Sequence, residues 1–445
     1  MKLFIYLFFG SMVIVMLSCE KYLDIKPRSN MVVPKTLDDM QQLLDNGTVF
    51  SPYPELLELQ ADDFYFDETY WNSMSNLVEK NAYVWERDIY GTTESHPSWS
   101  QPYSKIFYAN AVLDGLEQIE RTDSNAIRYD QIKGSALFLK AEAVYLLAQL
   151  FAKVYDERTA DEDLGIPIPM SADVNEGVYR PSLQYTFDFI TNTLVEAETM
   201  LSPMVDFSRP SKAAAHAMLA RVYLYMGKYD QAQSHSNSSL ELFDDIIDLN
   251  NRNIRDYKNT LLIRFNSPGN EIWNLKVSTT IDTALIAQYE VNDKRLSTFF
   301  AQTNEGKWMK QRFNNLSVLT FNGLDADEQL LIRAESYARQ GKLDLALADL
   351  NRLLMNRYLV GAFVPYDSSD QEDVLDNVLK ERRKELVFRA LRWSDLKRLN
   401  RDGAEITLRR KLGDRVFTLP PNDLRWVLPI PLNELNLTDI PQNQR

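Results

Sequence analysis

The chain has 445 residues, of which 45% are hydrophobic and 25% are charged, a balance typical of a globular protein and not of a disordered chain. It carries 49 Lys and Arg against 63 Asp and Glu, which gives a net charge of −14. A protein that binds the phosphate backbone normally has the opposite sign, so we expect no nucleic-acid partner. The single cysteine excludes a disulfide framework, a cysteine-based zinc site and a redox pair of thiols.

The first residues, 1–18, are predicted to be a lipoprotein signal peptide. Lys2 precedes the apolar stretch Leu3–Leu17, which is too short to span a membrane comfortably. The stretch ends in Ser18 and Cys19, and a small residue before a cysteine is what cleavage of bacterial lipoproteins requires. The alternative is an ordinary leader with an incidental cysteine. Because the chain has no other cysteine, we expect Cys19 to be lipidated and to tether the mature chain to a membrane.

Most of the remaining chain has the apolar periodicity of helices. We expect helices over Ala126–Tyr155, over Ser182–Leu201 and from Ser211 onward, the last two each opened by a serine that can cap the helix. Three segments break this pattern: Ala61–Gln101, Thr260–Lys310 and Arg415–Arg445. The second contains short strand-like pieces, Thr260–Phe265 and Glu271–Val277. We therefore predict a scaffold of helices with loop-rich insertions and a few short strands, and the insertions are candidate functional loops.

Two segments share the spacing of a tetratricopeptide helix-turn-helix repeat. Both copies have a small residue, a tyrosine, a glycine and a second small residue at the same offsets: Ala220, Tyr223, Gly227 and Ala232, then Ala334, Tyr337, Gly341 and Ala346. Small residues let two helices approach closely, and the glycine permits a tight turn. The spacing predicts paired helices, and because the copies are not adjacent, other helix pairs or insertions must lie between them.

Motifs of known catalytic sites are missing from the sequence. It contains no Gly-x-Ser-x-Gly elbow, no phosphate-binding loop with Gly-Lys-Ser or Gly-Lys-Thr, and no His-Glu-x-x-His. His96, His216 and His235 lie far apart, so a metal site among them would need long-range assembly, and we expect none. The acidic runs Asp161–Asp163 and Asp325–Glu328 lack the glycine-centred turn of a calcium loop, and we expect both to be solvated loops. We predict no enzymatic activity and no cofactor.

A basic run within residues 380–398 looks in isolation like a nucleic-acid patch. Acidic residues are interleaved at helical spacings, as in the pairs Glu381 with Glu385 and Arg392 with Asp395. A salt-bridged helix with an apolar face explains this run better than a nucleic-acid site does.

Aromatic residues are concentrated between Asp62 and Tyr108. Sugar rings present flat C–H faces, which match aromatic planes, and hydroxyl edges, which hydrogen-bond to carboxylates and amides. The run Tyr70-Trp71-Asn72 combines both kinds of group beside two acidic residues. We predict that a glycan-binding site includes five residues: Tyr65, Tyr70, Trp71, Asn72 and Trp308.

Other aromatic residues are expected to fill the core. The segment Trp99–Tyr108 leads into an expected helix around Ile106–Leu116, Trp85 alternates with Tyr83 as on a strand, and Trp273 stands among apolar neighbours.

Five places, in order along the chain, carry a family resemblance. They are Cys19–Pro27; the spacing of Trp99, Tyr103, Ile106 and Asn110; Arg180-Pro181-Ser182 with the repeat Ala220–Ala232; the run Glu381–Arg398; and Pro429-Ile430-Pro431 with Glu434 and Gln442-Asn443. Together they resemble the outer-membrane lipoproteins of the SusD/RagB family over the whole mature chain. One departure is visible, because the family signature usually has Glu-Gly where Arg389-Ala390 stands.

The resemblance implies a fold and an organisation. The fold would be all-α dominated, an α-superhelix of tetratricopeptide-like helix pairs with a loop-rich ligand face. Residues 1–18 would be the signal peptide and residues 19–445 a single domain, with halves over about 19–245 and about 260–445.

The resemblance also implies a function. The protein would be a lipid-anchored, glycan-binding subunit on the exterior of the outer membrane, without catalytic activity or cofactor. It would form a lid on a TonB-dependent, SusC-like transporter and deliver oligosaccharide or polysaccharide to it. The alternatives are a peptide-binding member of the family and a mainly structural lid of the same type of transporter.

Overall fold

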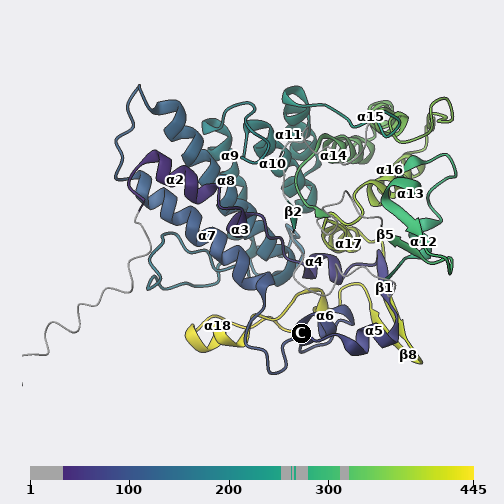
Figure 1. Ribbon diagram of the computed structural model, residues 1–445, viewed down its shortest axis with the longest axis horizontal. Helices are drawn as coiled ribbons and strands as arrows, with labels where there is room; N and C mark the ends of the chain where they lie inside the picture. The colour runs from purple at the N-terminus through teal and green to yellow at the C-terminus, as the bar shows by residue number, and fades with distance from the viewer. Residues whose placement is uncertain (1–33, 252–261, 263–264, 267–278, 311–319) are drawn as a thin grey trace, which may run out of the picture.

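A computed structural model of the chain describes residues 34–251, 262, 265–266, 279–310 and 320–445 (Figure 1). The predicted leader, Cys19, the strand expected over Glu271–Val277 and Trp273 lie outside the described residues, as does most of Thr260–Phe265.

The secondary structure is dominated by helices, as predicted. The elements of the first half are α2 (Leu37–Leu44), α3 (Gly47–Phe50), α4 (Leu56–Leu59), β1 (Phe64–Phe66), α5 (Glu68–Ser73), α6 (Leu77–Tyr83), α7 (Pro97–Leu116), α8 (Ala126–Phe151), α9 (Leu183–Met200), α10 (Lys212–Met226) and α11 (Tyr229–Leu242). Those of the second half are β2 (Phe265–Asn266), β3 (Thr279–Ile281), α12 (Thr283–Ile286), α13 (Lys294–Phe299), β4 (Phe300–Gln302), β5 (Trp308–Lys310), β6 (Thr320–Phe321), α14 (Ala326–Arg339), α15 (Leu343–Met355), α16 (Gln371–Glu385), α17 (Arg392–Arg401), β7 (Leu408–Leu412), β8 (Arg415–Leu419), the 3-10 turn η1 (Leu424–Trp426) and α18 (Leu432–Leu437).

Local signals place the long helices. Ser182 and Ser211 cap α9 and α10, because their hydroxyl oxygens accept hydrogen bonds from backbone N–H groups in the first turn. Gly227 ends α10 with a left-handed φ of 78°, and Gly341 separates α14 from α15 with a φ of 73°. Both tetratricopeptide-like hairpins are therefore confirmed, as α10–α11 and α14–α15.

The long helices form a continuous array in which each contacts its neighbours. Figure 1 shows α7, α8 and α9 at one end of the molecule, α10 and α11 in the middle, and α15 and α16 at the other end. Every residue of α8 from Gly134 to Phe151 is buried, because other elements surround this helix, and most of these residues are apolar, with Lys140 and Glu142 as charged exceptions. By length and composition α8 could cross a membrane, but its apolar window is entirely buried inside the protein.

The described strands are short and pair only in twos. The antiparallel pairs are β1 with β3, β2 with β6, β4 with β5, and β7 with β8. In Figure 1, β1, α5, α6 and β8 lie together along one edge of the helical array. This edge carries most of the aromatic segment that the sequence singles out.

The helix expected over residues 380–398 is two helices, and that part of the prediction is wrong. Helix α16 ends at Glu385 and α17 begins at Arg392. Between them Phe388 and Ala390 have left-handed φ values of 61° and 57°, which a continuous right-handed helix excludes. The backbone N–H of Ala390 donates to the carboxylate of Glu58 at 2.8 Å, which satisfies a buried donor that the break exposes.

Candidate functional site

Four of the five candidate residues come from one strand and the helix that follows it. The side chain of Asp67 caps α5 by accepting a hydrogen bond from the backbone N–H of Tyr70 at 2.8 Å. The cap fixes where α5 starts, and the helix then carries Tyr70, Trp71 and Asn72. Tyr65 lies just before it at the centre of β1, opposite Thr280 of β3.

Tyr65 is the most exposed of the four candidate aromatic residues. Its neighbours Phe64 and Phe66 are each only 1% exposed, whereas Tyr65 is 40% exposed. Alternate residues of a strand point to opposite faces, so burying the two phenylalanines turns the tyrosine outward. Partial burial, followed by the charge of Asp282, raises the pKa of the Tyr65 hydroxyl, which therefore stays protonated and able to donate a hydrogen bond at neutral pH.

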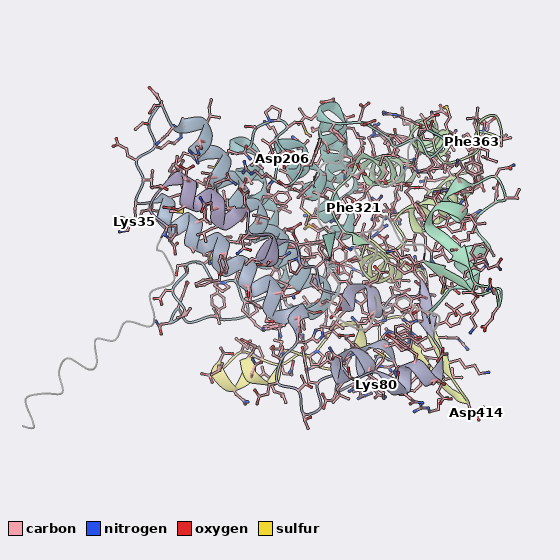
Figure 2. All side chains as sticks on the ribbon, in the orientation of Figure 1. Lys35, Lys80, Asp206, Phe321, Phe363 and Asp414 are labelled. Carbon is pink, nitrogen blue, oxygen red and sulfur yellow. The ribbon has the colours of Figure 1, made fainter. Side chains whose placement is uncertain are left out.

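Trp71 is 8% exposed and is held from several sides. Its indole N–H donates to the backbone carbonyl of Lys80 at 3.0 Å. The ammonium of Lys80 lies 4.7 Å from the ring centroid, and the guanidinium of Arg415 lies 4.9 Å from it. Figure 2 labels Lys80 on α6 and Asp414, the residue next to Arg415, at the tip of the β7–β8 hairpin. A ligand that reaches the face of this indole must therefore displace one of the two cations.

The other candidates differ in exposure and in position. Tyr70 is half-buried with its ring 4.8 Å from that of Phe66, and Asn72 is exposed. Trp308 is half-buried on β5, opposite Gln302 of β4. Because β3 contacts both β1 and β5, the strand of Trp308 lies one strand away from that of Tyr65. The structure thus places Tyr65 on β1, Tyr70, Trp71 and Asn72 on the helix that follows it, and Trp308 on an adjacent β pair. The ring of Tyr70 packs on Phe66, whereas Tyr65 points to the opposite face of β1.

Two charged residues outside the five candidates, Arg415 and Glu68, lie at this part of the surface beside Trp71. Arg415, on β8, lies over Trp71 and pairs with Glu68 of α5 at 3.6 Å. A signal for the hairpin is present in the sequence, because Gly413-Asp414 separates two strands as a two-residue turn, and Gly413 has a left-handed φ of 58°. Nothing local indicates that the hairpin tip contacts α5, since some 340 residues separate them in the sequence.

Most of the remaining aromatic residues of the segment are buried in the core, and Tyr103, Phe107 and Tyr108 are half-buried. Trp99 and Tyr103 lie on α7, as predicted. The strand expected for Tyr83 and Trp85 is wrong. Tyr83 ends α6, and Trp85 follows it in a turn with a left-handed φ of 56°, buried and donating its indole N–H to the carbonyl of Gln60 at 3.1 Å.

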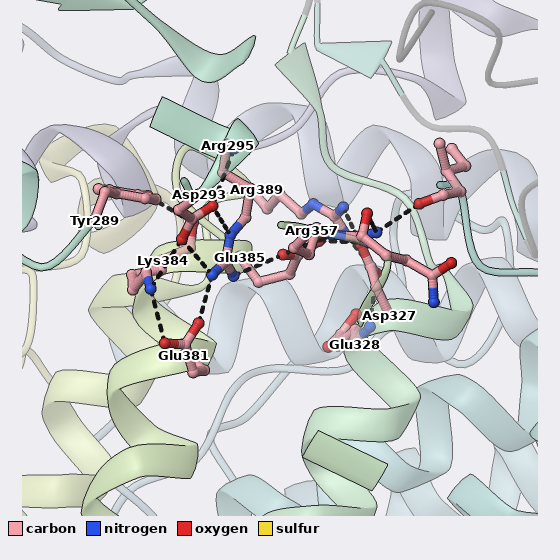
Figure 3. A network of polar contacts seen from close by, with 12 residues as sticks. Tyr289, Asp293, Arg295, Asp327, Glu328, Arg357, Glu381, Lys384, Glu385 and Arg389 are labelled. Carbon is pink, nitrogen blue, oxygen red and sulfur yellow. Dashed lines mark hydrogen bonds and ion pairs between the residues drawn. The ribbon is translucent and has the colours of Figure 1, made fainter. Parts of the chain in front are cut away.

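The acidic run Asp325–Glu328 belongs to a buried polar network, so the expected solvated loop is wrong (Figure 3). Asp325 caps α14, Asp327 accepts a hydrogen bond from Arg389 at 2.9 Å, and Glu328 accepts one from Arg221 at 2.8 Å. The second run is mixed, because Asp163 is buried while Asp161 and Glu162 are exposed.

The same network continues around Arg295, whose guanidinium lies within 3.0 Å of the carboxylates of Asp293, Glu381 and Glu385. Burial opposes ionisation of Glu385, but Arg357 and Arg295 hold its pKa well below the usual range. Arginine side chains are the ion-pair partners of these carboxylates. We therefore assign the network, with its cavity of about 50 Å³, to the scaffold.

The salt-bridged character of residues 380–398 is confirmed, with local pairs such as Lys384 with Glu381 and other pairs that are distant in the sequence. Arg392 pairs with Asp62 of the aromatic segment at 2.7 Å, and Arg382 pairs with Asp395 at 2.9 Å across the break between α16 and α17.

The three histidines lie at two separate places in the structure. His216 lies beside His235, whereas His96 lies between Glu55 and Glu79.

Two family descriptions match most of the chain. Residues 21–224 match the family described as "Starch-binding associating with outer membrane", and residues 327–443 match the SusD family. No curated protein matches the sequence.

Several solved structures share the fold. A SusD superfamily protein from Bacteroides vulgatus superposes with a TM-score of 0.75 at 20% identity, over 92% of this chain and 99% of that one. A SusD superfamily protein from Bacteroides thetaiotaomicron gives 0.74 at 19% identity, over 92% and 100%. A putative sugar binding protein from Bacteroides vulgatus gives 0.74 at 18% identity, over 92% and 99%. At these identities the likeness shows the fold, and it agrees with the predicted superhelix of tetratricopeptide-like helix pairs.

Proposed function

Because the chain belongs to the SusD/RagB family, we propose that it captures oligosaccharide or polysaccharide at the cell surface and delivers it to a partner TonB-dependent outer-membrane transporter. Residues 21–224 match a family described as starch binding in association with the outer membrane, and this description supports both the ligand class and the location. The name of the similar Bacteroides vulgatus structure, a putative sugar binding protein, supports the same ligand class.

The single observation that carries the glycan site is the outward-facing ring of Tyr65 on β1; the exposed side chain of Asn72 lies on α5, the helix that follows this strand. A tyrosine ring held on a strand gives a stacking plane with little freedom to lose, and a neighbouring amide can donate to and accept from sugar hydroxyls. We propose Tyr65 as the main platform, with Tyr70, Trp71, Asn72 and Trp308 around it. We expect weak single-site affinity, because an open face excludes little water, and useful affinity only for ligands that bind several sites.

The test is a titration of the chain from residue 20, without its lipid, against a panel of neutral and acidic polysaccharides while tryptophan fluorescence is recorded. A saturable response to one glycan class supports the proposal. Replacing Tyr65 with alanine then removes a stacking contact worth about 1 kcal/mol, which corresponds to a roughly fivefold weaker Kd. Tyr185 on α9 is exposed to a similar degree, 45%, so Tyr185→Ala is the matched control and should bind as the parent does. Unchanged affinity in both Tyr65→Ala and Asn72→Ala would contradict the site.

The membrane anchor is a separate part of the proposal. Cys19 lies outside the described residues, so the anchor depends on the sequence alone. We expect the full-length protein to fractionate with outer membranes and to be degraded by protease added to intact cells. A Cys19→Ser variant should lose acylation, as measured by mass spectrometry of its N-terminal peptide. Retention of an acylated N-terminus by that variant would contradict the anchor.

The same protein and its variants distinguish the two alternative functions, peptide binding and a mainly structural lid. No fluorescence response to any glycan of the panel, together with binding of peptides from a library, would support a peptide-binding member of the family. Co-purification with the transporter in a variant that has lost all glycan binding would favour a mainly structural lid. We propose that the protein carries no hydrolytic activity, so a bound glycan should keep its chain length after prolonged incubation, as measured by size-exclusion chromatography.

A further inference from the structure

Three metal-ligating side chains meet on three consecutive long helices, away from the proposed glycan face. Glu198 comes from the last turns of α9, His216 from α10 and His235 from α11. The Nδ1 atoms of the two histidines are 3.1 Å apart. The Oε2 atom of Glu198 lies 3.3 Å from Nδ1 of His216 and 4.0 Å from Nδ1 of His235. The packing of α10 against both α9 and α11 brings these residues together from distant positions in the sequence.

We infer that Glu198, His216 and His235 form a binding site for Zn²⁺ or a similar divalent transition metal. Zinc takes imidazole nitrogen and carboxylate oxygen at about 2.0–2.1 Å in tetrahedral geometry, which puts neighbouring ligand atoms about 3.3 Å apart. The three separations of 3.1, 3.3 and 4.0 Å bracket that value, so small rotations of the side chains suffice to hold one ion.

The surroundings suit an ion with one open position. His216 is buried, but the side chains of Glu198 and His235 are each 21% exposed, so water can reach the site and complete a tetrahedron. The ring of Tyr223 stacks on that of His235, with centroids 5.4 Å apart and planes at 19°, which fixes the direction in which the imidazole points. Two histidines and one glutamate are a ligand set that zinc adopts in proteins.

The protonation states of the ligands also suit a metal. Burial lowers the pKa of His216 to about 4, and burial lowers that of His235, so both imidazoles are neutral and able to bind metal at pH 7. One charge opposes the ion, since Lys212 of α10 is close enough to lower the pKa values of both His216 and Glu198. Without a metal, Nδ1 of one neutral imidazole can donate a hydrogen bond to Nδ1 of the other, and binding of a metal by both Nδ1 atoms requires that proton to move to Nε2 of its own ring.

The chemical role that this position supports is structural. An ion held by α9, α10 and α11 would cross-link the middle of the helical array, in addition to the packing and the hydrogen bond from Ser239 to the carbonyl of Ala213 that join these helices. Binding to the folded chain and not to the unfolded one raises the melting temperature by mass action.

The test uses the mature chain without a histidine tag and freed of metal with a chelator. We expect Co²⁺ to give the intense visible absorption of a tetrahedral site, Zn²⁺ to displace it at one equivalent, and Zn²⁺ to raise the Tm. His235→Gln and Glu198→Gln should each weaken Zn²⁺ binding by more than the roughly 10- to 100-fold typical of losing an outer-shell partner.

The third histidine provides the matched control. His96 lies with Glu55 and Glu79 in the other group of possible metal ligands in the described part of the chain, and His96→Asn should leave the Co²⁺ spectrum unchanged. Glu198 is partly exposed, so Glu198→Gln keeps the test valid if a histidine variant fails to fold. The inference is overturned if the folded parent gives neither the Co²⁺ band nor a Tm shift with Zn²⁺. It is equally overturned if His96→Asn abolishes the band while His235→Gln and Glu198→Gln retain it.

Discussion

The two repeat glycines allow the same substitution to be compared in two environments. Gly227 and Gly341 occupy equivalent turns, with left-handed φ values of 78° and 73°. A Cβ atom added at Gly341 would meet no atom within 4 Å, whereas one added at Gly227 would lie 3.0 Å from a terminal nitrogen of Arg401. Alanine at Gly341 therefore imposes only the left-handed backbone, and alanine at Gly227 also forces Arg401 to move.

The two costs can be estimated separately. A left-handed residue with a Cβ costs about 1–2 kcal/mol, and the reduced freedom of the unfolded chain returns about 0.4–1 kcal/mol, so Gly341→Ala should lose about 1 kcal/mol of stability. Arg401 donates to the carbonyl of Tyr225 at 2.6 Å and to that of Tyr155 at 3.0 Å. Hydrogen bonds from a charged donor are worth roughly 1.5–3 kcal/mol, so weakening this pair should bring the loss for Gly227→Ala to about 3 kcal/mol.

Urea unfolding followed by circular dichroism measures both losses, and the m-value should stay unchanged. The second cost should disappear in an Arg401→Met background, where Gly227→Ala should lose only about 1 kcal/mol more than that background. Equal losses for Gly227→Ala and Gly341→Ala in the parent chain would refute the reasoning, because the surroundings would then have no effect.

Three further predictions concern buried positions and can be measured by the same unfolding assay. Ala390→Gly should stabilise the protein by about 0.5–1 kcal/mol, because glycine relieves a buried residue held at a φ of 57°; a loss of stability would show that the alanine methyl is needed for packing. The parent should lose stability as the pH falls from 6.5 to 4, because His96 takes up a proton over this range in the unfolded chain, whereas burial lowers its pKa in the folded chain to about 4. His96→Asn keeps a side chain that can cap α7 and should reduce this loss by about 3 kcal/mol. Parallel dependence of stability on pH in the parent and the variant would contradict the assignment. Arg295→Leu should cost about 3–5 kcal/mol, because three buried carboxylates each lose one of their two cationic partners, while Arg158→Leu, which breaks an exposed pair, should have little effect; similar losses would argue against burial as the cause.

The helical scaffold could be predicted because its signals are local. A serine that caps a helix and a glycine that ends one act within a few residues, so Ser182, Ser211, Gly227 and Gly341 indicate helix boundaries without knowledge of the rest of the fold. The break between α16 and α17 could not be predicted in this way. Ala390 gives no local sign of a left-handed conformation, and its N–H is satisfied by Glu58, which is distant in the sequence. The family usually has glycine at this position, and the left-handed φ of 57° at Ala390 explains that preference.

The composition of the site could be predicted, but the accessibility of each residue could not. Phe64, Tyr65 and Phe66 are all aromatic, so the sequence has no polar contrast to show which ring faces outward, and the pairing of β1 with β3 decides it. Trp71 is buried because Lys80 and Arg415 lie over its ring, and Arg415 arrives from the other end of the chain. Single-sequence patterns carry no information on contacts of that range.

The distribution of charge in the structure bears on which glycans the surface favours. Several arginines in the core are paired with carboxylates, as Arg398 is with Glu335 and Asp395, whereas buried Arg410 donates to backbone carbonyls. The chain as a whole carries a net charge of −14. On the proposed glycan face, two cations lie over the buried ring of Trp71: Lys80, 4.7 Å away, donates to the backbone carbonyl of Asn72, and Arg415, 4.9 Å away, is paired with Glu68. A polyanionic glycan would meet a protein of net negative charge, and one of the two cations near Trp71 is already paired with Glu68, whereas a neutral oligosaccharide needs only a ring to stack on and groups that bind hydroxyls. The charge distribution and the exposure of Tyr65 thus favour the same class of ligand, an uncharged sugar chain.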